Sequence, residues 1–335
     1  MPIIPWIEQN ISLADDISSE LDKPDFTRYP YQIEILKQWE DLSCRKHVIV
    51  MCCEQLGKTS LAVYGILYRL TYKPGSILCC YPSDNKAAEI NQAKFIPLLS
   101  RLPGIKEELQ RPRTIRSDRI KMSNAVMYWQ GSGSKIISKS CDCVFLDEID
   151  QWSTENPQNV RDGWKRTRSF NSCMEIAVCS PTTQTGQIYQ EFMKGSQGYY
   201  TLRCQKCREL TLRSCDIHHL QWESTYNEAL KTYIVKKGTE RLICPKCGFE
   251  HTEDMKRMMI LEGEYVHVVP ELKKERPSYQ IGCLASQLKS MSWSEIANAA
   301  LESRKDFRYL NPAELRQLLE RTSIQASSYN ERRDN

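Results

Sequence analysis

Four short apolar runs, the last two of which end in polar residues, constrain the fold of this chain more than any other feature. We predict buried strands at residues 47–53, 75–82, 141–150 and 172–183. Between them lie stretches with helical spacing, at 60–70 and from Ser83 or Asp84 onward, where either residue could cap a helix. Strands that alternate with helices predict a largely parallel α/β sheet with helices on both faces.

The first run leads into "CCEQLGKTS", which ends like a phosphate-binding loop. Such a loop needs backbone N–H groups around phosphate oxygens, a lysine that reaches the β and γ phosphates, and a hydroxyl on Mg²⁺. Cys52 replaces the opening glycine, but it is a small residue that is compatible with the turn. The predicted ATP-binding residues are Gln55, Leu56, Gly57, Lys58, Thr59 and Ser60.

The third run, "VFLDEID", ends in the carboxylates Asp147 and Glu148. An acidic pair at a strand end is commonly a solvated turn. Because this pair follows a GKT loop at a suitable distance, we interpret it as a Walker B motif. Asp147 is predicted to hold Mg²⁺ together with Thr59, and Glu148 to deprotonate the attacking water.

Two further segments have both a functional and a structural interpretation. Ser180-Pro181-Thr182 ends the fourth run, where translocating ATPases carry a motif that couples the γ-phosphate to motion; the alternative is a proline turn. Gln32 precedes the loop at the distance where helicase-like ATPases hold an adenine-reading glutamine. The alternative is the start of an amphipathic helix.

Cysteines at 204, 207, 244 and 247 form two C-x2-C pairs. Each pair can curl into a knuckle that presents two thiolates, so Cys204, Cys207, Cys244 and Cys247 are predicted to bind one structural Zn²⁺. A redox role would need only one pair. Cys215, His218 and His219 lie between the pairs and are weaker candidates.

Composition excludes some classes of protein. No apolar run approaches the roughly 20 residues that span a bilayer, and the N-terminus lacks the features of a signal peptide, so we expect no membrane contact and a reducing compartment. A formal net charge of +4 permits nucleic-acid binding without arguing for it. We also expect a hairpin at 119–131, a strand at 278–286, and helices at 293–307 and 311–322.

These segments together resemble a known family. The order of the GKT loop, "CDCVFLDEID", "RDGWKRTRSF", "CSPTTQTGQIY", "CQKC…CPKCG" and "GCLASQLKSMSWSEIANAAL" is similar to the large terminase subunit of tailed phages, in the lambda-like branch with a zinc-binding insertion. The likeness covers about residues 25–310. It implies an additional-strand, RecA-like P-loop ATPase that packages double-stranded viral DNA into a procapsid in the host cytoplasm. The implied partners are the portal protein, the small terminase subunit and further copies in a ring.

Under this resemblance, Lys58, Thr59, Asp147, Glu148 and Ser180–Thr182 take the family's roles. Glu54 stands where some terminases carry a basic residue that acts as an arginine finger. The candidates to supply that finger from a neighbouring subunit are Arg161, Arg166 and Arg168. A solvated basic face near DNA phosphates is the alternative for these three.

The resemblance suggests a domain organisation: an arm at 1–30, an ATPase core at 31–199, a zinc insertion at 200–252, the rest of the ATPase domain at 253–310, and a helix and tail at 311–335. The family's nuclease domain has no room after residue 310, so we expect no nuclease activity in this chain. Two alternatives stay open: half of a DEAD-like helicase, since "DEID" matches in spelling, and a non-enzymatic zinc-ribbon module that binds DNA.

Overall fold

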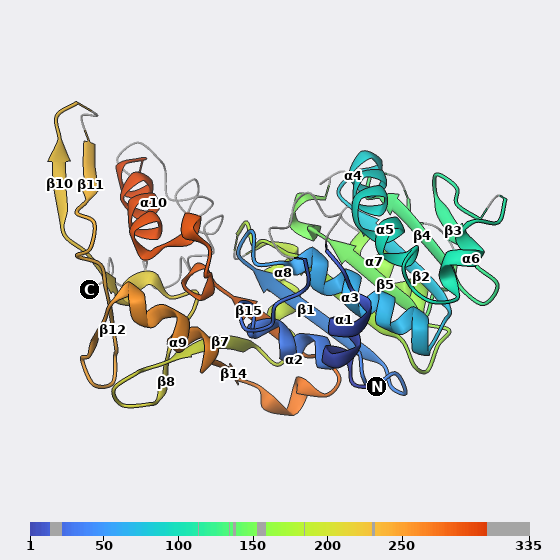
Figure 1. The fold of residues 1–335 in the computed structure, drawn as a ribbon, viewed down its shortest axis with the longest axis horizontal. Coiled ribbons are helices and arrows are strands. Elements are labelled where there is room, and N and C mark those ends of the chain that lie inside the picture. Colours follow the sequence, from blue (N-terminus) through green and yellow to red (C-terminus); the bar gives the residue numbers. More distant parts are fainter. Residues whose placement is uncertain are drawn as a thin grey trace. The chain divides into compact units, whose positions relative to one another are not determined.

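The computed structural model describes residues 1–13, 22–112, 114–133, 135–136, 139–152, 159–183, 185–229 and 232–306 (Figure 1). The predicted helix at 311–322 and the tail lie outside these residues. The chain divides into two compact units. Unit 1 comprises residues 1–50, 57–179 and 271–277, and unit 2 comprises residues 51–56, 180–270 and 278–335.

Unit 1 contains a largely parallel sheet in the order β1-β6-β5-β2-β4-β3. The strand pairs β2–β4, β2–β5 and β5–β6 are parallel, and β3 runs antiparallel to β4. The strands are β1 Lys46–Cys52, β2 Ser76–Tyr81, β3 Arg119–Lys121, β4 Val126–Gly131, β5 Cys143–Asp147 and β6 Met174–Cys179. All four predicted strands and the predicted hairpin are confirmed.

The helices of unit 1 follow the predicted alternation. They are α1 Ile3–Asn10, α2 Tyr31–Lys37, α3 Lys58–Tyr72, α4 Asp84–Ile90, α5 Ile96–Leu99, α6 Ile105–Leu109 and α7 Asn159–Trp164. Ser83 caps α4, because its side chain accepts a hydrogen bond from the backbone N–H of Lys86 at 3.2 Å. A π-helical turn, Asn91–Phe95, joins α4 to α5. Helix α3 contacts β6, and helix α7 contacts β5. Helix α4 contacts both β2 and β4.

The core of unit 1 forms where these helices meet the sheet. Every residue of β1 is buried, as expected for a strand of a parallel sheet. Helix α3 is buried along most of its length, and this buried part includes the charged residue Arg69, which is 1% exposed and lies 2.9 Å from Asp142. Because a buried charge must be paired, this contact fixes α3 to the start of β5.

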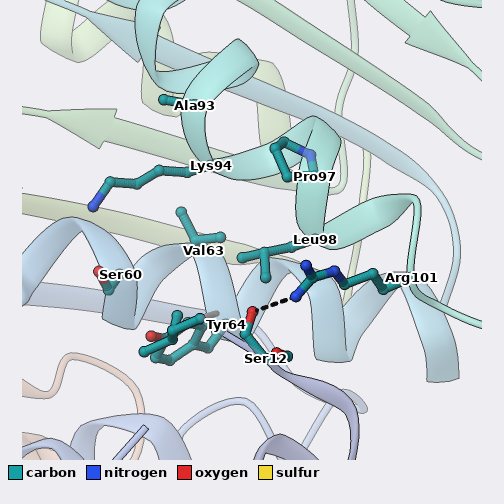
Figure 2. A pocket seen from close by; sticks show the side chains of 10 residues that line it. Ser12, Ser60, Val63, Tyr64, Ala93, Lys94, Pro97, Leu98 and Arg101 are labelled. Carbon is teal, nitrogen blue, oxygen red and sulfur yellow. Dashed lines mark hydrogen bonds between the residues drawn. The ribbon is translucent and has the colours of Figure 1, made fainter. Parts of the chain in front are cut away.

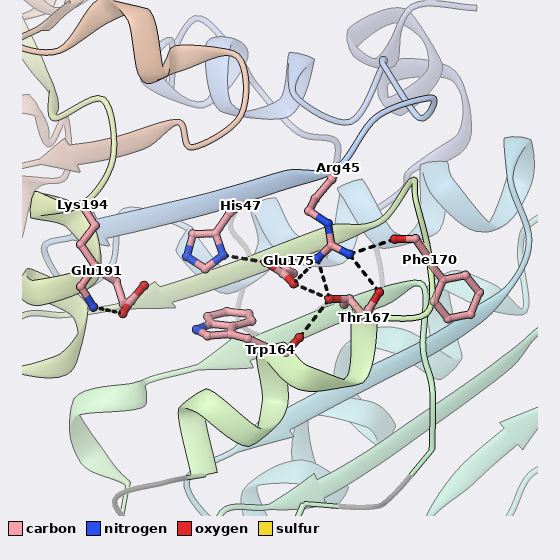
Figure 3. Close-up of polar contacts among 8 residues, drawn as sticks. All are labelled: Arg45, His47, Trp164, Thr167, Phe170, Glu175, Glu191 and Lys194. Atoms are coloured by element: carbon pink, nitrogen blue, oxygen red, sulfur yellow. Dashed lines mark hydrogen bonds and ion pairs between the residues drawn. The ribbon is translucent and has the colours of Figure 1, made fainter.

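A second buried polar cluster joins the starts of β1 and β6 (Figure 3). Glu175 accepts a hydrogen bond from Arg45 at 3.1 Å, lies 2.8 Å from Nδ1 of His47, and accepts another from the hydroxyl of Thr167. The ring of Trp164 packs edge-on against His47. The carboxylate of Glu175 therefore holds the segment that follows α7 against the sheet.

Unit 2 is built around strand β7. In the order β14-β7-β15, β14 is antiparallel and β15 parallel to β7, and β8 pairs with β7 antiparallel. Two small antiparallel sheets, β10-β11 and β13-β12-β9, complete the unit. The elements are α8 Gln187–Met193, β7 Gly198–Arg203, β8 Leu210–Arg213, β9 Leu220–Gln221, β10 Ser224–Asn227, β11 Thr232–Val235, β12 Arg241–Ile243, β13 Glu250–His251, α9 Lys256–Leu261, β14 Glu264–His267, β15 Ser278–Ile281 and α10 Trp293–Asp306.

The strand predicted at 278–286 is confirmed as the shorter β15, and the helix predicted at 293–307 is confirmed as α10. Short 3-10 helices span Ile149–Gln151, Lys165–Thr167, Ile217–His219, Glu253–Met255, Pro270–Lys273, Cys283–Ala285 and Lys289–Met291. Among the described residues, no helix combines the length and apolarity that crossing a bilayer requires.

Candidate functional site

The segment between β1 and α3 has the backbone of a tight loop. Gln55 and Gly57 both adopt positive φ angles, of 60° and 77°. Gly57 is the cap residue and Lys58 the first residue of α3, so Lys58 and Thr59 lie in its first turn. The N–H groups of that turn have no partner within the helix, which makes a helix N-terminus a favourable place for an anion.

Gly57 also packs closely against α2. A Cβ atom built on Gly57 would lie 2.6 Å from Nε2 of Gln32, far inside van der Waals contact. Gln32 is 5% exposed and belongs to the first turn of α2. The structure therefore places the Gln32 amide directly against the glycine of the loop, and a side chain at position 57 would require that amide to move.

Strand β5 carries Glu148 towards the same place. The β5–β6 ladder continues one residue past Asp147, where the backbone N–H of Glu148 donates to the carbonyl of Val178 at 2.8 Å. Glu148 itself is left-handed, with φ of 50°. Its Oε1 lies 2.8 Å from Nζ of Lys58, and both side chains are largely buried. Its Oε2 accepts a hydrogen bond from the thiol of Cys179 at 3.4 Å.

Asp147, the last residue of β5, has a buried carboxylate of which one oxygen lacks the hydrogen bond that would offset the cost of burial. The residue is 2% exposed, and its Oδ1 has no hydrogen-bond partner among the residues that the structure describes. Burial, reinforced by the negative charge of Glu148, raises the pKa of Asp147 to about 7, although Lys58, Lys86 and Lys94 act in the opposite direction. An orphaned buried carboxylate oxygen is costly, and a cation removes that cost.

The residues present fit a magnesium ion. Mg²⁺ is held by one or two carboxylates, with water and phosphate oxygens as its other ligands. Asp147 offers an unsatisfied carboxylate oxygen, and Thr59 offers a hydroxyl from the first turn of α3. This set consists of hard oxygen donors.

Ser60 lies on a different face of α3. It lines a narrow cavity of about 20 Å³ together with Val63 and Tyr64 of α3 and Lys94 of the π-helical turn (Figure 2). Arg101 closes one end by donating to the carbonyl of Ser12 at 3.0 Å. The cavity is too small for a nucleotide base, and the role of Ser60 in ATP binding stays a prediction.

The remaining predicted residues occupy less defined positions. Ser180 and Pro181 are buried and Thr182 is half-buried, directly after β6. Arg161 lies in α7 and, like Arg168, is exposed, whereas Arg166 donates from Nε to the carbonyl of Asp162 at 3.0 Å. Nothing in these positions assigns a role to the three arginines.

Two functional features were not predicted. Cys179, the last residue of the fourth apolar run, donates to Glu148 and also accepts the backbone N–H of Asp150 at 3.5 Å. Lys94 acts on Asp147 from the π-helical turn. The position of Cys179 at the end of a predicted strand was a sequence signal that could have identified it. The spacing of Lys94 from the motifs gives no such signal.

Unit 2 brings the four predicted cysteines together. Their Sγ atoms all lie within 4.8 Å of one another, with Cys204 3.7 Å from Cys247 and Cys207 3.8 Å from Cys244. Zinc–sulfur bonds of about 2.3 Å in a tetrahedron place the sulfur atoms about 3.8 Å apart. The spacing of the thiols therefore fits a four-cysteine Zn²⁺ site.

The two cysteine pairs have the same local structure. In the first knuckle, Cys204 donates to the carbonyl of Glu209 and accepts from the N–H of Arg208; Cys244, Phe249 and Gly248 repeat this pattern in the second. Arg208 and Gly248 occupy equivalent positions, with φ angles of 63° and 66°. Two equivalent knuckles facing each other are typical of a zinc ribbon.

The comparison with protein families identifies one family. The family model described as "Phage terminase large subunit gpA, ATPase domain" matches residues 18–265 of the 335. No curated protein sequence matches the chain.

Solved structures of phage large terminases are similar at low sequence identity. The large terminase of bacteriophage HK97 has a TM-score of 0.45 and 16% identity, over 58% of this chain and 40% of the HK97 chain. The large terminase ATPase domain of Thermus phage P74-26 has a TM-score of 0.34 and 13% identity, over 84% of this chain and 90% of that domain. A large terminase of a thermophilic bacteriophage, solved in complex with ATP-gamma-S, has a TM-score of 0.34 and 15% identity, over 46% and 38% of the two chains.

Proposed function

The chain belongs to the family of phage terminase large subunits of the gpA type, in its ATPase domain, and we propose that it is the ATP-hydrolysing motor that translocates double-stranded viral DNA into a procapsid. One observation supports this proposal most strongly. Lys58, Asp147 and Glu148 come from the starts and ends of different elements, and the fold gathers them at one place, with Lys58 2.8 Å from Glu148.

ATP is proposed to bind over the N-terminus of α3. Gln55, Leu56 and Gly57 would surround the phosphates with backbone N–H groups, and Lys58 would contact the β and γ phosphates. Gln32 of helix α2, which packs against Gly57, would read the adenine.

Hydrolysis transfers the γ-phosphoryl group to water. In the proposed mechanism Glu148 accepts a proton from the water as its oxygen bonds to the γ-phosphorus, and the bond to the bridging oxygen breaks to leave ADP. Lys58 stabilises the charge that develops on the phosphate oxygens. Asp147 and Thr59 would hold Mg²⁺, which when bound neutralises charge on the β and γ phosphates.

Three further elements of the proposal extend beyond this site. Ser180, Pro181 and Thr182 would couple hydrolysis to movement, since they follow the strand that pairs with β5. One of Arg161, Arg166 and Arg168 would act as an arginine finger in a neighbouring subunit of a ring. The four cysteines of unit 2 would bind structural Zn²⁺, and the portal protein and small terminase subunit would be the assembly partners.

The experiment that tests this function is ATP turnover by the purified chain, with and without duplex DNA, for the wild type and Lys58→Ala. The proposal predicts turnover that duplex DNA stimulates and that the substitution abolishes. Turnover that is absent under all conditions, or unchanged by Lys58→Ala, would contradict it. Unwinding of a tailed duplex would instead favour a helicase.

A further inference from the structure

The segment of unit 1 that leads into the hairpin and forms its first strand carries a concentration of positive charge that the sequence motifs do not explain. Residues 101–121 contain seven lysines and arginines and three acids, a net charge of +4. The whole chain also has a net charge of +4, so the remaining residues sum to zero. This segment, which includes α6 and β3, therefore carries a net charge equal to that of the whole chain.

This segment encloses a cavity of about 380 Å³. Arg111, Arg116, Arg119 and Lys121 line it, together with the single acid Glu108. Alternation along β3 explains part of the arrangement, because Arg119 and Lys121 project to one face while Ile120 between them is fully buried.

Backbone hydrogen bonds hold the walls of the cavity in place. The N–H of Lys121 donates to the carbonyl of Thr114 at 2.9 Å, and the N–H of Arg116 donates to the carbonyl of Arg119 at 2.8 Å. The carboxylate of Glu108 accepts the backbone N–H of Ser123 at 2.5 Å. The one acid that lines the cavity is therefore engaged in fixing the turn of the hairpin.

The basic side chains differ in how far they are already paired. Arg119 lies 3.0 Å from Asp118, and Arg111 donates to the hydroxyl of Ser123 at 3.1 Å. Arg116 and Lys121 are exposed and form no ion pair with any residue that the structure describes. These two side chains are the groups best placed to meet an external anion.

We infer that this cavity contacts the phosphate backbone of double-stranded DNA, with Arg116 and Lys121 as the principal contacts. The choice of DNA as the ligand rests on the proposed function. The positive charge, the cavity and the two cations without an ion pair are observed in residues 101–121 and do not depend on that proposal. Among the described residues, no aromatic side chain lines the cavity. Single-stranded nucleic acid is usually held by stacking of bases on aromatic rings, so a duplex backbone is the better match.

The position in the sheet separates this surface from the nucleotide site. Lys121 pairs with Val126, and Val126 pairs with Ser76 at the start of β2. Asp147 lies at the other end of these parallel strands, where β5 finishes at its C-terminal residue. Substitutions in the hairpin should therefore leave ATP turnover without DNA unchanged.

The test is binding of a fluorescent duplex to the full chain, measured by anisotropy between 50 and 200 mM salt. The test variant is Arg116→Ala/Lys121→Ala, and the control is Lys237→Ala/Lys289→Ala, which removes two exposed charges from unit 2. Loss of two phosphate contacts should make the negative slope of log affinity against log salt shallower by about 1.8. Between 50 and 200 mM salt, the factor by which the affinity drops should therefore be about twelve times smaller for the variant than for the wild type.

The control should bind like the wild type, and the charge-conserving variant Arg116→Lys/Lys121→Arg should recover most of the slope. A test variant with the wild-type affinity and slope would overturn the inference while leaving the proposed function intact. A variant that also loses ATP turnover in the absence of DNA would overturn it too, because the residues would then be structural. A wild type with neither DNA binding nor ATP turnover would contradict both.

Discussion

The Nζ atom of Lys58 lies 2.8 Å from Oε1 of Glu148. The two residues belong to the start of α3 and the turn after β5, so their contact depends on the whole order of the sheet. The pair also has a mechanistic consequence. If Lys58 binds the phosphates of ATP, the nucleotide competes with Glu148 for the ammonium group, and Glu148 becomes available to accept a proton from water.

Glu148→Gln should therefore abolish hydrolysis without abolishing binding. Glutamine keeps the size of the side chain but cannot act as a base, and loss of a general base typically lowers turnover by a factor of about 10²–10⁴. Turnover and the affinity for a fluorescent ATP analogue measure the two effects separately. Glu54→Gln, at an exposed acid of the same loop, is the control and should behave as the wild type. Undiminished turnover by Glu148→Gln would show that the base is misassigned.

Gly57→Ala should damage the nucleotide site more than backbone strain alone would. Alanine in a left-handed conformation costs about 1–2 kcal/mol, and here its Cβ would also meet Gln32. Gly104→Ala is a matched control, because Gly104 has a similar φ of 79° but nothing within 4 Å of the added atom.

Thermal unfolding and nucleotide affinity should both fall further in Gly57→Ala than in Gly104→Ala. Truncating the partner, in Gly57→Ala/Gln32→Ala, should recover the excess loss of stability. Equal effects of the two glycine substitutions would mean that the contact with Gln32 is easily relieved.

Much of this fold could be predicted because its strands are apolar along their whole length. Runs such as 47–53 and 172–183 are long enough to identify buried strands, and the polar residues that end 141–150 and 172–183 mark the end of the sheet where the site forms. The predicted ends differ by one residue from those of β1, whereas the run 172–183 begins two residues before β6 and ends four residues after it. The same logic identified Asp147 and Glu148, because an acidic pair at the end of a buried strand that follows a GKT loop at a suitable distance is typical of a Walker B motif.

Other features depend on contacts that no short segment encodes. The thiol of Cys179 meets Glu148 only because β5 and β6 are neighbours in the sheet. The π-helical turn at Asn91–Phe95 shifts one hydrogen-bond register inside an otherwise regular helical pattern. The basic cavity was not predicted, because a net charge of +4 for the whole chain does not show where along the sequence the positive charge is concentrated.

Cys244→Ser should remove zinc and loosen the two knuckles. Structural zinc contributes directly to folding, so a missing thiolate lowers both metal affinity and local stability. Metal analysis should give one zinc per wild-type chain and much less in the variant, and limited proteolysis should cut residues 200–250 faster. Cys44→Ser, at a half-buried thiol outside the cluster, should retain zinc. A wild type purified under reducing conditions without zinc would refute the site.

Glu175 should make the stability of unit 1 sensitive to acid. Burial alone would raise the pKa of Glu175, but hydrogen bonds from His47 and Thr167 and the charge of Arg45 outweigh burial and lower it below the usual 4.5. A lowered pKa means that the stabilisation is complete above about pH 4.5 and disappears as the pH falls through the folded-state value.

Glu175→Gln should therefore cost about 1–3 kcal/mol at neutral pH and flatten the decline of stability in acid. Chemical denaturation between pH 3 and pH 7 measures this, with Glu107→Gln at an exposed acid as the control. If the variant and the wild type lose stability in parallel as the pH falls, the network does not depend on the charge of Glu175.

The most direct measurement is a crystal structure of the chain with Mg²⁺ and a non-hydrolysable ATP analogue. We predict that the triphosphate lies over the N-terminus of α3, that Lys58 Nζ moves from Glu148 to the β and γ phosphates, and that the cation lies between the Thr59 hydroxyl and the Oδ1 atom of Asp147. A nucleotide bound elsewhere, or a cation out of reach of Asp147, would contradict the account.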